Sequence, residues 1–274
     1  MDIFATKAVY PKRIDFPSVA IINMSSKVKN SEMRAVTRSL QIQVLRDFIP
    51  IWGIAADIEF YEDEKLIPVD AWKIIVLDTE KDAEVMGYHE LTEDGYPQGK
   101  VYVDESVNAD VAWSITLSHE LLELLVDPYT DLLAMHQLGK KKVRLYAYEV
   151  CDPVQNDWYV IGGVKVSNFV YPEWFESDAK NLGGKWDFLA KLKAPFTLTE
   201  GGYASYIEVV AGGWKEISAR TKNEFEICRK NREFPEIIGA KVPFFKGLWV
   251  KIKKLFTGYK DAIEQKKTEI EIKK

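Results

Sequence analysis

One helix constrains this chain more than any other segment. Residues 111–126 (VAWSITLSHELLELLV) are apolar around almost the whole circumference, so we expect a buried helix. At 100° per residue, the polar side chains His119, Glu120 and Glu123 fall on one stripe about 100° wide, together with Thr116 and Asp127. A buried carboxylate without a partner costs several kcal/mol, so something must compensate this stripe. A divalent cation would do so, and a water-filled cleft would also serve.

The spacing of the stripe favours the cation. Residues four apart lie one turn up on the same helix face, about 5–6 Å apart at Cβ, so His119 and Glu123 can reach one ion. Glu120 lies at the edge of the stripe, where we expect it to act as the catalytic base toward an ion-activated water. A solvated helix face with two good helix formers is the alternative interpretation. The surrounding leucines argue against it.

A third ligand must come from outside the helix, because an open catalytic zinc site uses three protein ligands. The segment YEVCDP offers Glu149 and Asp152, two acidic residues in an aromatic and apolar strand. We expect Glu149 to be a ligand. We expect Asp152 to hydrogen-bond His119 or to coordinate the ion in place of Glu149.

Three other residues are weaker candidates for this ligand. Asp127 shares the stripe but lies about 12 Å along the helix from His119, so we expect it to end the helix or to support a ligand. His136 follows in a polar stretch and is expected at the surface. Cys151 is expected to be a structural buried thiol.

The order of the predicted elements indicates an α+β fold with a twisted mixed sheet packed on two helices. Strands are predicted at 18–24, 56–61, 72–78 and, as an edge strand, 100–104. A long helix is capped by Asn30 or Ser31 and closed by Pro50, and the 111–126 helix is capped by Asn108 or Asp110 and stops at 127–128. Residues 87–99, with His89, are predicted to form a loop.

The second half of the chain is more irregular. Strands are predicted at 146–151 and at 158–170, the latter folded as a tight hairpin at Gly162 and Gly163. We divide the chain into residues 14–128, which carry the active-site helix, residues 129–240, which supply the third ligand, and a basic amphipathic tail, residues 241–274.

Charge and composition exclude several classes of protein. The net charge is −5, but residues 241–274 carry +6 and the remainder carries −11, with 27 basic and 38 acidic residues. Such an acidic body is unsuited to nucleic acid, which requires clustered Lys and Arg. The chain contains no run of 18 apolar residues, so no transmembrane segment is predicted. Two cysteines and no apolar leader predict a reducing, cytoplasmic setting, or a virion if the chain is phage-encoded.

The basic tail has the pattern of an amphipathic helix. Its apolar residues recur at intervals of three or four, with most lysines on other faces. We expect it to dock on the acidic body, on a neighbouring subunit or on a membrane surface.

These motifs resemble the zincin metallopeptidases, and more closely a bacterial and phage family of metallopeptidases with an HExxExxxDP motif followed by ExxDP. In this chain the motifs begin at His119 and Glu149, and the resemblance covers most of residues 15–220. It implies a zincin-like fold, a zinc ion, and a peptide or protein substrate added as a strand along Lys100, Val101, Tyr102 and Val103. Zincins usually have His where this chain has Glu123. A carboxylate is a harder ligand, so another divalent cation is also compatible.

Three functions fit these observations. The first is a metal-dependent hydrolase, foremost a zinc peptidase that uses a metal-activated water. The second is a non-enzymatic phage virion or assembly protein that retains the fold. The third is a metal-stabilised binding module. Glu120 favours the enzyme, because a purely structural ion needs no base.

Overall fold

The computed structural model describes residues 16–79, 85–139, 142–177, 184–209 and 213–219. The chain divides into two units, Met1–Arg229 and Lys230–Lys274, and every described residue belongs to the first. The predicted amphipathic tail, residues 241–274, lies outside the described residues. Among the described helices, none is long and apolar enough to cross a membrane.

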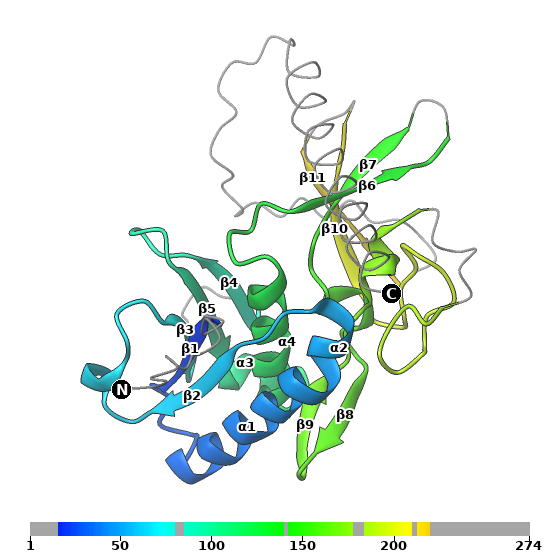
Figure 1. Ribbon diagram of the computed structural model, residues 1–274. Coiled ribbons are helices and arrows are strands. Elements are labelled where there is room, and N and C mark those ends of the chain that lie inside the picture. The colour runs from blue at the N-terminus through cyan, green and yellow to red at the C-terminus, as the bar shows by residue number, and fades with distance from the viewer. Residues whose placement is uncertain (1–15, 80–84, 140–141, 178–183, 210–212, 220–274) are drawn as a thin grey trace, which may run out of the picture. The chain divides into compact units, whose positions relative to one another are not determined.

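The described part is an α+β protein with one five-stranded sheet, one four-stranded sheet and a hairpin (Figure 1). The strands are β1 Ser18–Asn23, β2 Asp57–Tyr61, β3 Trp72–Leu77, β4 Gly87–Leu91, β5 Pro97–Tyr102, β6 Leu133–Gln137, β7 Val143–Ala147, β8 Trp158–Ile161, β9 Val164–Ser167, β10 Tyr203–Glu208 and β11 Trp214–Ser218. The helices are α1 Asn30–Ile42, α2 Ile49–Trp52, α3 Val103–Asn108 and α4 Trp113–Val126, with π-helical turns at Gln43–Phe48 and 3-10 turns at Glu64–Leu66, Asp152–Val154 and Pro172–Phe175.

The five-stranded sheet has the order β2-β1-β3-β5-β4. All its neighbouring strands are parallel except β4, which runs antiparallel to β5 at the edge. Strand β1 is an apolar run because it is paired on both sides and buried on both faces. Helix α1 packs on β1 and β2, helix α4 packs on β3, β4 and β5, and β9 lies against both helices.

The predicted peptide-binding strand was wrong, because β5 is not an edge strand. β5 is paired with β3 on one side and with β4 on the other, so its backbone cannot accept a further strand. Val101 and Tyr102 are fully buried, and Val103 already belongs to α3. Lys100 donates to the Tyr88 hydroxyl, 2.9 Å away, on β4. The predicted loop at 87–99 is instead the hairpin that supplies β4.

Helix ends also differ from the predictions. Pro50 does not close the first helix, since it lies in the first turn of α2, where a missing N–H is tolerated, and the helix ends at Gly53 with a left-handed φ of 68°. Asn30 is already helical and follows the N-cap residue Lys29, and no side chain caps the helix there. Asn108 ends α3, and Asp110, with a φ of 57°, lies in the turn between α3 and α4.

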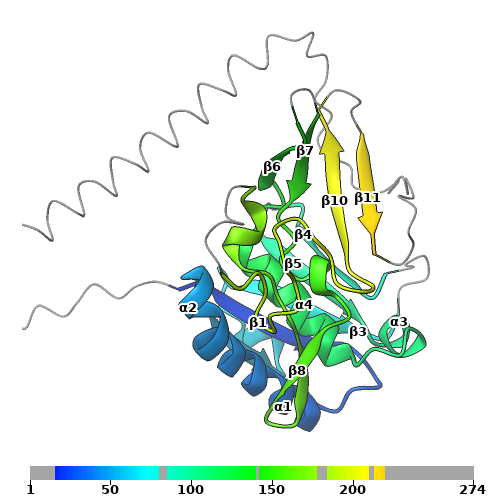
Figure 2. The ribbon, with the colours of Figure 1, turned by 90° about the vertical axis from the view of Figure 1, so that its right-hand side faces the viewer.

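The four-stranded antiparallel sheet has the order β11-β10-β7-β6, and Figure 2 shows its strands side by side. The hairpin β8–β9 turns at Gly162 and Gly163, as predicted.

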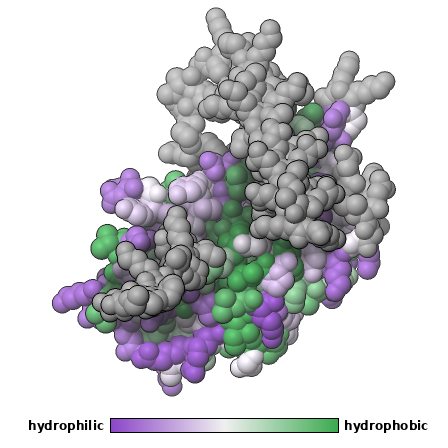
Figure 3. Space-filling view, viewed as in Figure 1, coloured by the Kyte–Doolittle hydropathy of each residue, from purple (hydrophilic) through white to green (hydrophobic). Residues whose placement is uncertain are grey.

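One hydrophobic core runs from Val19 on β1 to Tyr206 on β10 and crosses the predicted boundary at residue 128. Apolar surface is also visible around α2 (Figure 3).

A buried hydrogen-bond network ties α4 to the helical layer. Gln43, in the π-helical turns, accepts from the Ser118 hydroxyl at 2.7 Å and donates to the Ser167 carbonyl at 2.9 Å. Ser118 also accepts from the Ser167 backbone N–H at 3.0 Å. These bonds fix the rotation of α4 about its axis, and so they set the direction in which its acidic stripe points.

Candidate metal centre

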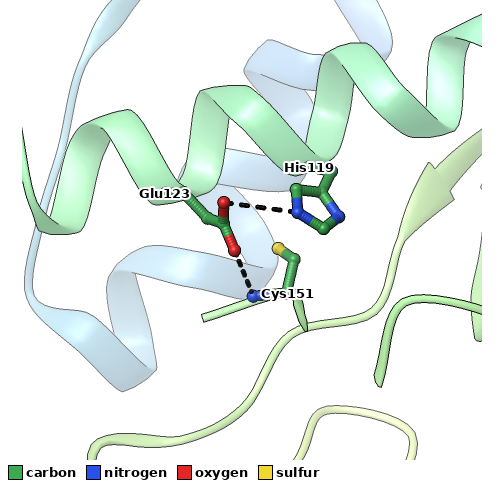
Figure 4. Close-up of side chains that lie close together, drawn as sticks. All are labelled: His119, Glu123 and Cys151. Atoms are coloured by element: carbon green, nitrogen blue, oxygen red, sulfur yellow. Dashed lines mark hydrogen bonds and ion pairs between the residues drawn. The ribbon is translucent and has the colours of Figure 1, made fainter. Parts of the chain in front are cut away.

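Helix α4 is buried along its whole length, as the sequence predicted. His119, Glu120 and Glu123 are buried with it, and His119 is the most exposed of the three at 8 %. The imidazole of His119 and the carboxylate of Glu123 meet one turn apart, with Nε2 3.2 Å from Oε2 (Figure 4). The sequence prediction that both side chains share one face is therefore confirmed.

Backbone amides fix the orientation of the Glu123 carboxylate. Oε1 accepts hydrogen bonds from the backbone N–H groups of Cys151, at 3.0 Å, and Asp152, at 3.3 Å. Those amides point at the helix because the chain bends at Val150 and Cys151 and then enters a 3-10 turn at Asp152. Oε2 is left to face the imidazoles.

The segment after β7 brings both predicted acidic residues to the helix. Asp152 Oδ1 lies 3.1 Å from His119 Nε2, which is the contact expected of this residue. Glu149 is also buried in the cluster, but it lies beyond the end of β7 and not on a strand. The predicted alternation along a 146–151 strand was therefore wrong, because the strand ends at Ala147; Glu149 lies in irregular chain before the bend at Val150 and Cys151, and Asp152 lies after it.

The sequence analysis missed His89, which belongs to the same cluster. Its Nδ1 lies 3.7 Å from Glu120 Oε2 and 3.9 Å from Glu123 Oε2, and its Nε2 lies 3.8 Å from Glu149 Oε2. The residue sits on β4, where His89 faces inward between more exposed neighbours. The Asp94-Gly95 turn between two short alternating runs is a hairpin signal, and it could have placed His89 on a strand.

Two groups of side chains could each hold a cation. One is His119, Glu123 and Cys151, and the other is His89, Glu123 and Glu149. Within each group the ligand atoms lie within 4.8 Å of one another. Both groups contain Glu123, so its carboxylate is the centre of the cluster. The predicted ligands thus converge, but Glu149 lies with His89, while Asp152 lies against His119.

The electrostatics of the metal-free cluster are dominated by its carboxylates. Burial disfavours an imidazolium at His89, but Glu149, Glu120 and Glu123 outweigh burial and raise the pKa of His89 to about 9. The pKa of His119 is also raised well above its usual value, because Glu123 and Asp152 outweigh the effect of burial. Burial raises the pKa of Glu123 to about 8. A cation would therefore compete with protons for these groups.

Two buried polar atoms of the cluster have no hydrogen-bond partner in the described part of the chain. These are His89 Nε2 and Glu120 Oε2. Buried polar atoms are nearly always satisfied, so such atoms indicate a missing partner. Imidazole nitrogen, carboxylate oxygen and thiol sulfur are all zinc ligands, and the residues present therefore fit a divalent cation.

Cys151 was expected to be a structural buried thiol; it is buried, and it lies next to the His119 imidazole. Its sulfur belongs to the His119 group, and burial raises the pKa of its thiol well above the usual value. Without a cation the thiol stays protonated. A cation at His119 would favour the thiolate.

Asp127 and His136 lie outside both groups. The Asp127 carboxylate accepts from the backbone N–H groups of Asp131 and Leu132, both at 3.1 Å, so it ends α4 and holds the following loop. Burial raises its pKa to about 6. His136 stacks on Phe196, with ring centroids 4.0 Å apart, in the four-stranded sheet region.

Comparison with known proteins adds no identity to this geometry. No family model matches the chain, and neither a curated protein nor a solved structure matches it.

Proposed function

We propose that this protein is a metal-dependent hydrolase with a zincin-like fold, in which a divalent cation, zinc in the first place, binds around Glu123. One observation carries the proposal: imidazoles and carboxylates from β4, α4 and the 149–152 segment converge in a buried cluster, in which His89 Nε2 and Glu120 Oε2 have no hydrogen-bond partner within the described ranges of the chain. Burying such a cluster without a cation would be costly, because each unpaired ionised group loses its hydration.

Each side chain has a role that follows from its contacts. Glu123 offers Oε2 because the amides of Cys151 and Asp152 hold Oε1. His119 is a ligand, and Asp152 coordinates beside it or orients its ring. When bound, the cation would lower the pKa of a water molecule to about 7. Glu120 Oε2 is buried and has no hydrogen-bond partner among the described residues, so it is the group that would accept the proton and return it to the leaving group.

We propose an extended peptide as the substrate, with β4 in place of β5 as the strand that receives it. β4 is the edge of the five-stranded sheet, and it carries His89, which faces Glu120 and Glu123. A peptide paired with the outer edge of β4 would run beside the cluster. The antiparallel edge strand next to the site helix supports a zincin-like arrangement.

A structural ion in a non-enzymatic protein, such as a virion or assembly component, is the second candidate. The observation that favours it is burial, since no residue of the cluster is more exposed than His119, at 8 %. Structural sites are closed, whereas catalytic sites keep a position for water. Glu120 separates the two candidates, because a structural ion needs no base.

The test compares metal content and hydrolysis of denatured protein in four samples. Wild type should bind cation and cleave the substrate, Glu120→Gln should bind cation and not cleave, and Glu123→Gln should lose both. Glu93→Gln, an exposed carboxylate in the β4–β5 turn, is the matched control and should behave as wild type. If wild type binds cation and none of the four samples cleaves the substrate, the structural ion is favoured. If wild type binds no cation, the proposal is refuted.

A further inference from the structure

We propose that the cluster holds two divalent cations, one at His119 and one at His89, joined by the Glu123 carboxylate. This inference rests on the proposed function, which requires only one cation. It assigns to His89, on β4, a role as ligand of a second ion.

The geometry of Glu123 is the first argument. Oε1 is held by two backbone amides, so Oε2 alone faces the imidazoles. Oε2 lies 3.2 Å from His119 Nε2 and 3.9 Å from His89 Nδ1. A single carboxylate oxygen of Glu123 therefore faces two imidazoles, that of His119 and that of His89. This is the position of a bridging oxygen in a two-metal site, where the ions lie about 3.5–4 Å apart.

The distances around each imidazole are close to those expected around one ion. Two ligand atoms that each lie about 2.0–2.2 Å from an ion are at most roughly 4.4 Å apart. His119 Nε2 meets this limit with Glu123 and Asp152, at 3.2 and 3.1 Å. His89 approaches Glu123 through Nδ1, at 3.9 Å, and Glu149 through Nε2, at 3.8 Å. An ion would take one of these nitrogens, and with one ligand atom from each residue the three atoms lie within 4.8 Å of one another, so the group needs a small adjustment to close on an ion. Neither imidazole needs to move far to bind.

The charge of the cluster is the second argument. Glu120, Glu123, Glu149 and Asp152 contribute four formal negative charges, all buried. One divalent cation would leave two of them uncompensated, and an imidazole that binds a cation is neutral and cannot help. Two divalent cations would balance the four carboxylates, and only the Cys151 thiolate, formed when a cation binds at His119, would remain in excess. Burial of uncompensated charge is costly, so the cluster as built favours two cations.

The unsatisfied atoms are the third argument. Glu120 Oε2 and His89 Nε2 are both buried and have no hydrogen-bond partner in the described part of the chain. His89 Nε2 lies 3.8 Å from Glu149, so a cation on this nitrogen would satisfy it, whereas a cation bound only at His119 would not. Glu120 Oε2 faces His89 Nδ1, at 3.7 Å, and keeps the role of base assigned above.

The two positions differ in chemical class. The His119 position includes the Cys151 sulfur, a soft ligand that favours zinc. The His89 position has one imidazole and carboxylates, which accept zinc or a harder ion such as Mn²⁺. We therefore expect Mn²⁺ to enter the His89 position more readily than the His119 position.

The experiment measures bound Zn²⁺ per chain after chelation and equilibrium dialysis of the full chain. Wild type should bind two ions, His89→Ala one and His119→Ala one, while His136→Ala, the control, should bind two. Glu149→Gln and Asp152→Asn repeat the test with isosteric changes if an alanine variant does not fold. One ion in wild type, or two in His89→Ala, would overturn the two-ion inference and leave the proposed function standing; no ion in wild type would remove both.

Electron paramagnetic resonance of the Mn²⁺-loaded chain tests the shared carboxylate. Two ions joined by Glu123 should give a spin-coupled signal in wild type, and His89→Ala should give the six-line signal of an isolated ion. Two bound ions without coupling would overturn the bridge.

Discussion

In protein stripped of divalent cations, replacement of His89 by glutamine should change how the free energy of unfolding depends on pH. The carboxylates around His89 raise its pKa from 6.5 to about 9 in the folded state. The folded protein therefore binds this proton more tightly than the unfolded chain does. The resulting stabilisation is fully present below pH 6.5 and is lost as the pH rises through about 9.

The magnitude follows from the two pKa values. A difference of one in pKa corresponds to about 1.4 kcal/mol, so the proton on His89 stabilises the folded state by about 3 kcal/mol at low pH. The side chain is 2 % exposed, so solvent screens this interaction little. Glu123, whose pKa is raised to about 8 by burial, contributes with the same sign, since its proton is also held more tightly in the folded state.

Urea unfolding of the chelated protein, followed by tryptophan fluorescence at pH 6.5 and 9.5, measures the effect. Between these values wild type should lose about 3 kcal/mol more than His89→Gln does. Saturating zinc should reverse the trend in wild type, because a cation binds only deprotonated ligands. Parallel losses in wild type and His89→Gln would refute the argument that the carboxylates hold a proton on this imidazole.

Three further changes test the surroundings of the cluster. Gly87→Ala would place a Cβ 2.9 Å from Glu120 Cγ and should lower the rate of hydrolysis about tenfold without changing metal content. Both quantities are measured on the same preparation. Ser118→Ala removes the buried bond to Gln43 and should lower the free energy of urea unfolding by about 1–3 kcal/mol. Asp127→Ala should cost about 1–2 kcal/mol in the same assay and leave metal content unchanged; lost metal would make Asp127 a ligand.

The sequence was a good guide wherever burial alone decides the structure. The apolar run of β1 was predicted because it is buried on both faces, β2 and β3 were also predicted, and α4 was predicted with its end at residue 126. The stripe on α4 correctly brought His119 and Glu123 together. These features depend on local periodicity, which a single sequence contains.

What the sequence did not predict depends on pairing between distant segments. Lys100 was expected on an edge strand, but the edge depends on whether residues 87–91 form a strand, which the polar turn beside them obscured. The same error hid His89. Glu149 was expected to face the helix through strand alternation, whereas it lies in irregular chain beyond the end of β7. Pro50 was expected to stop a helix, but the π-helical turns before it changed the hydrogen-bond pattern.

The amide bonds to Glu123 have a consequence for the order of folding. They join residues 28 and 29 positions apart, and the contact between His119 and Asp152 spans 33 positions. Such contacts form only after long loops have closed, and the β4 ligand also requires the sheet edge to be in place. In a zinc finger a short segment collapses around its ion, whereas here the chain must build the cluster before a cation can bind. Zinc should therefore lower the unfolding rate of this protein, while zinc added during refolding should leave the folding rate unchanged.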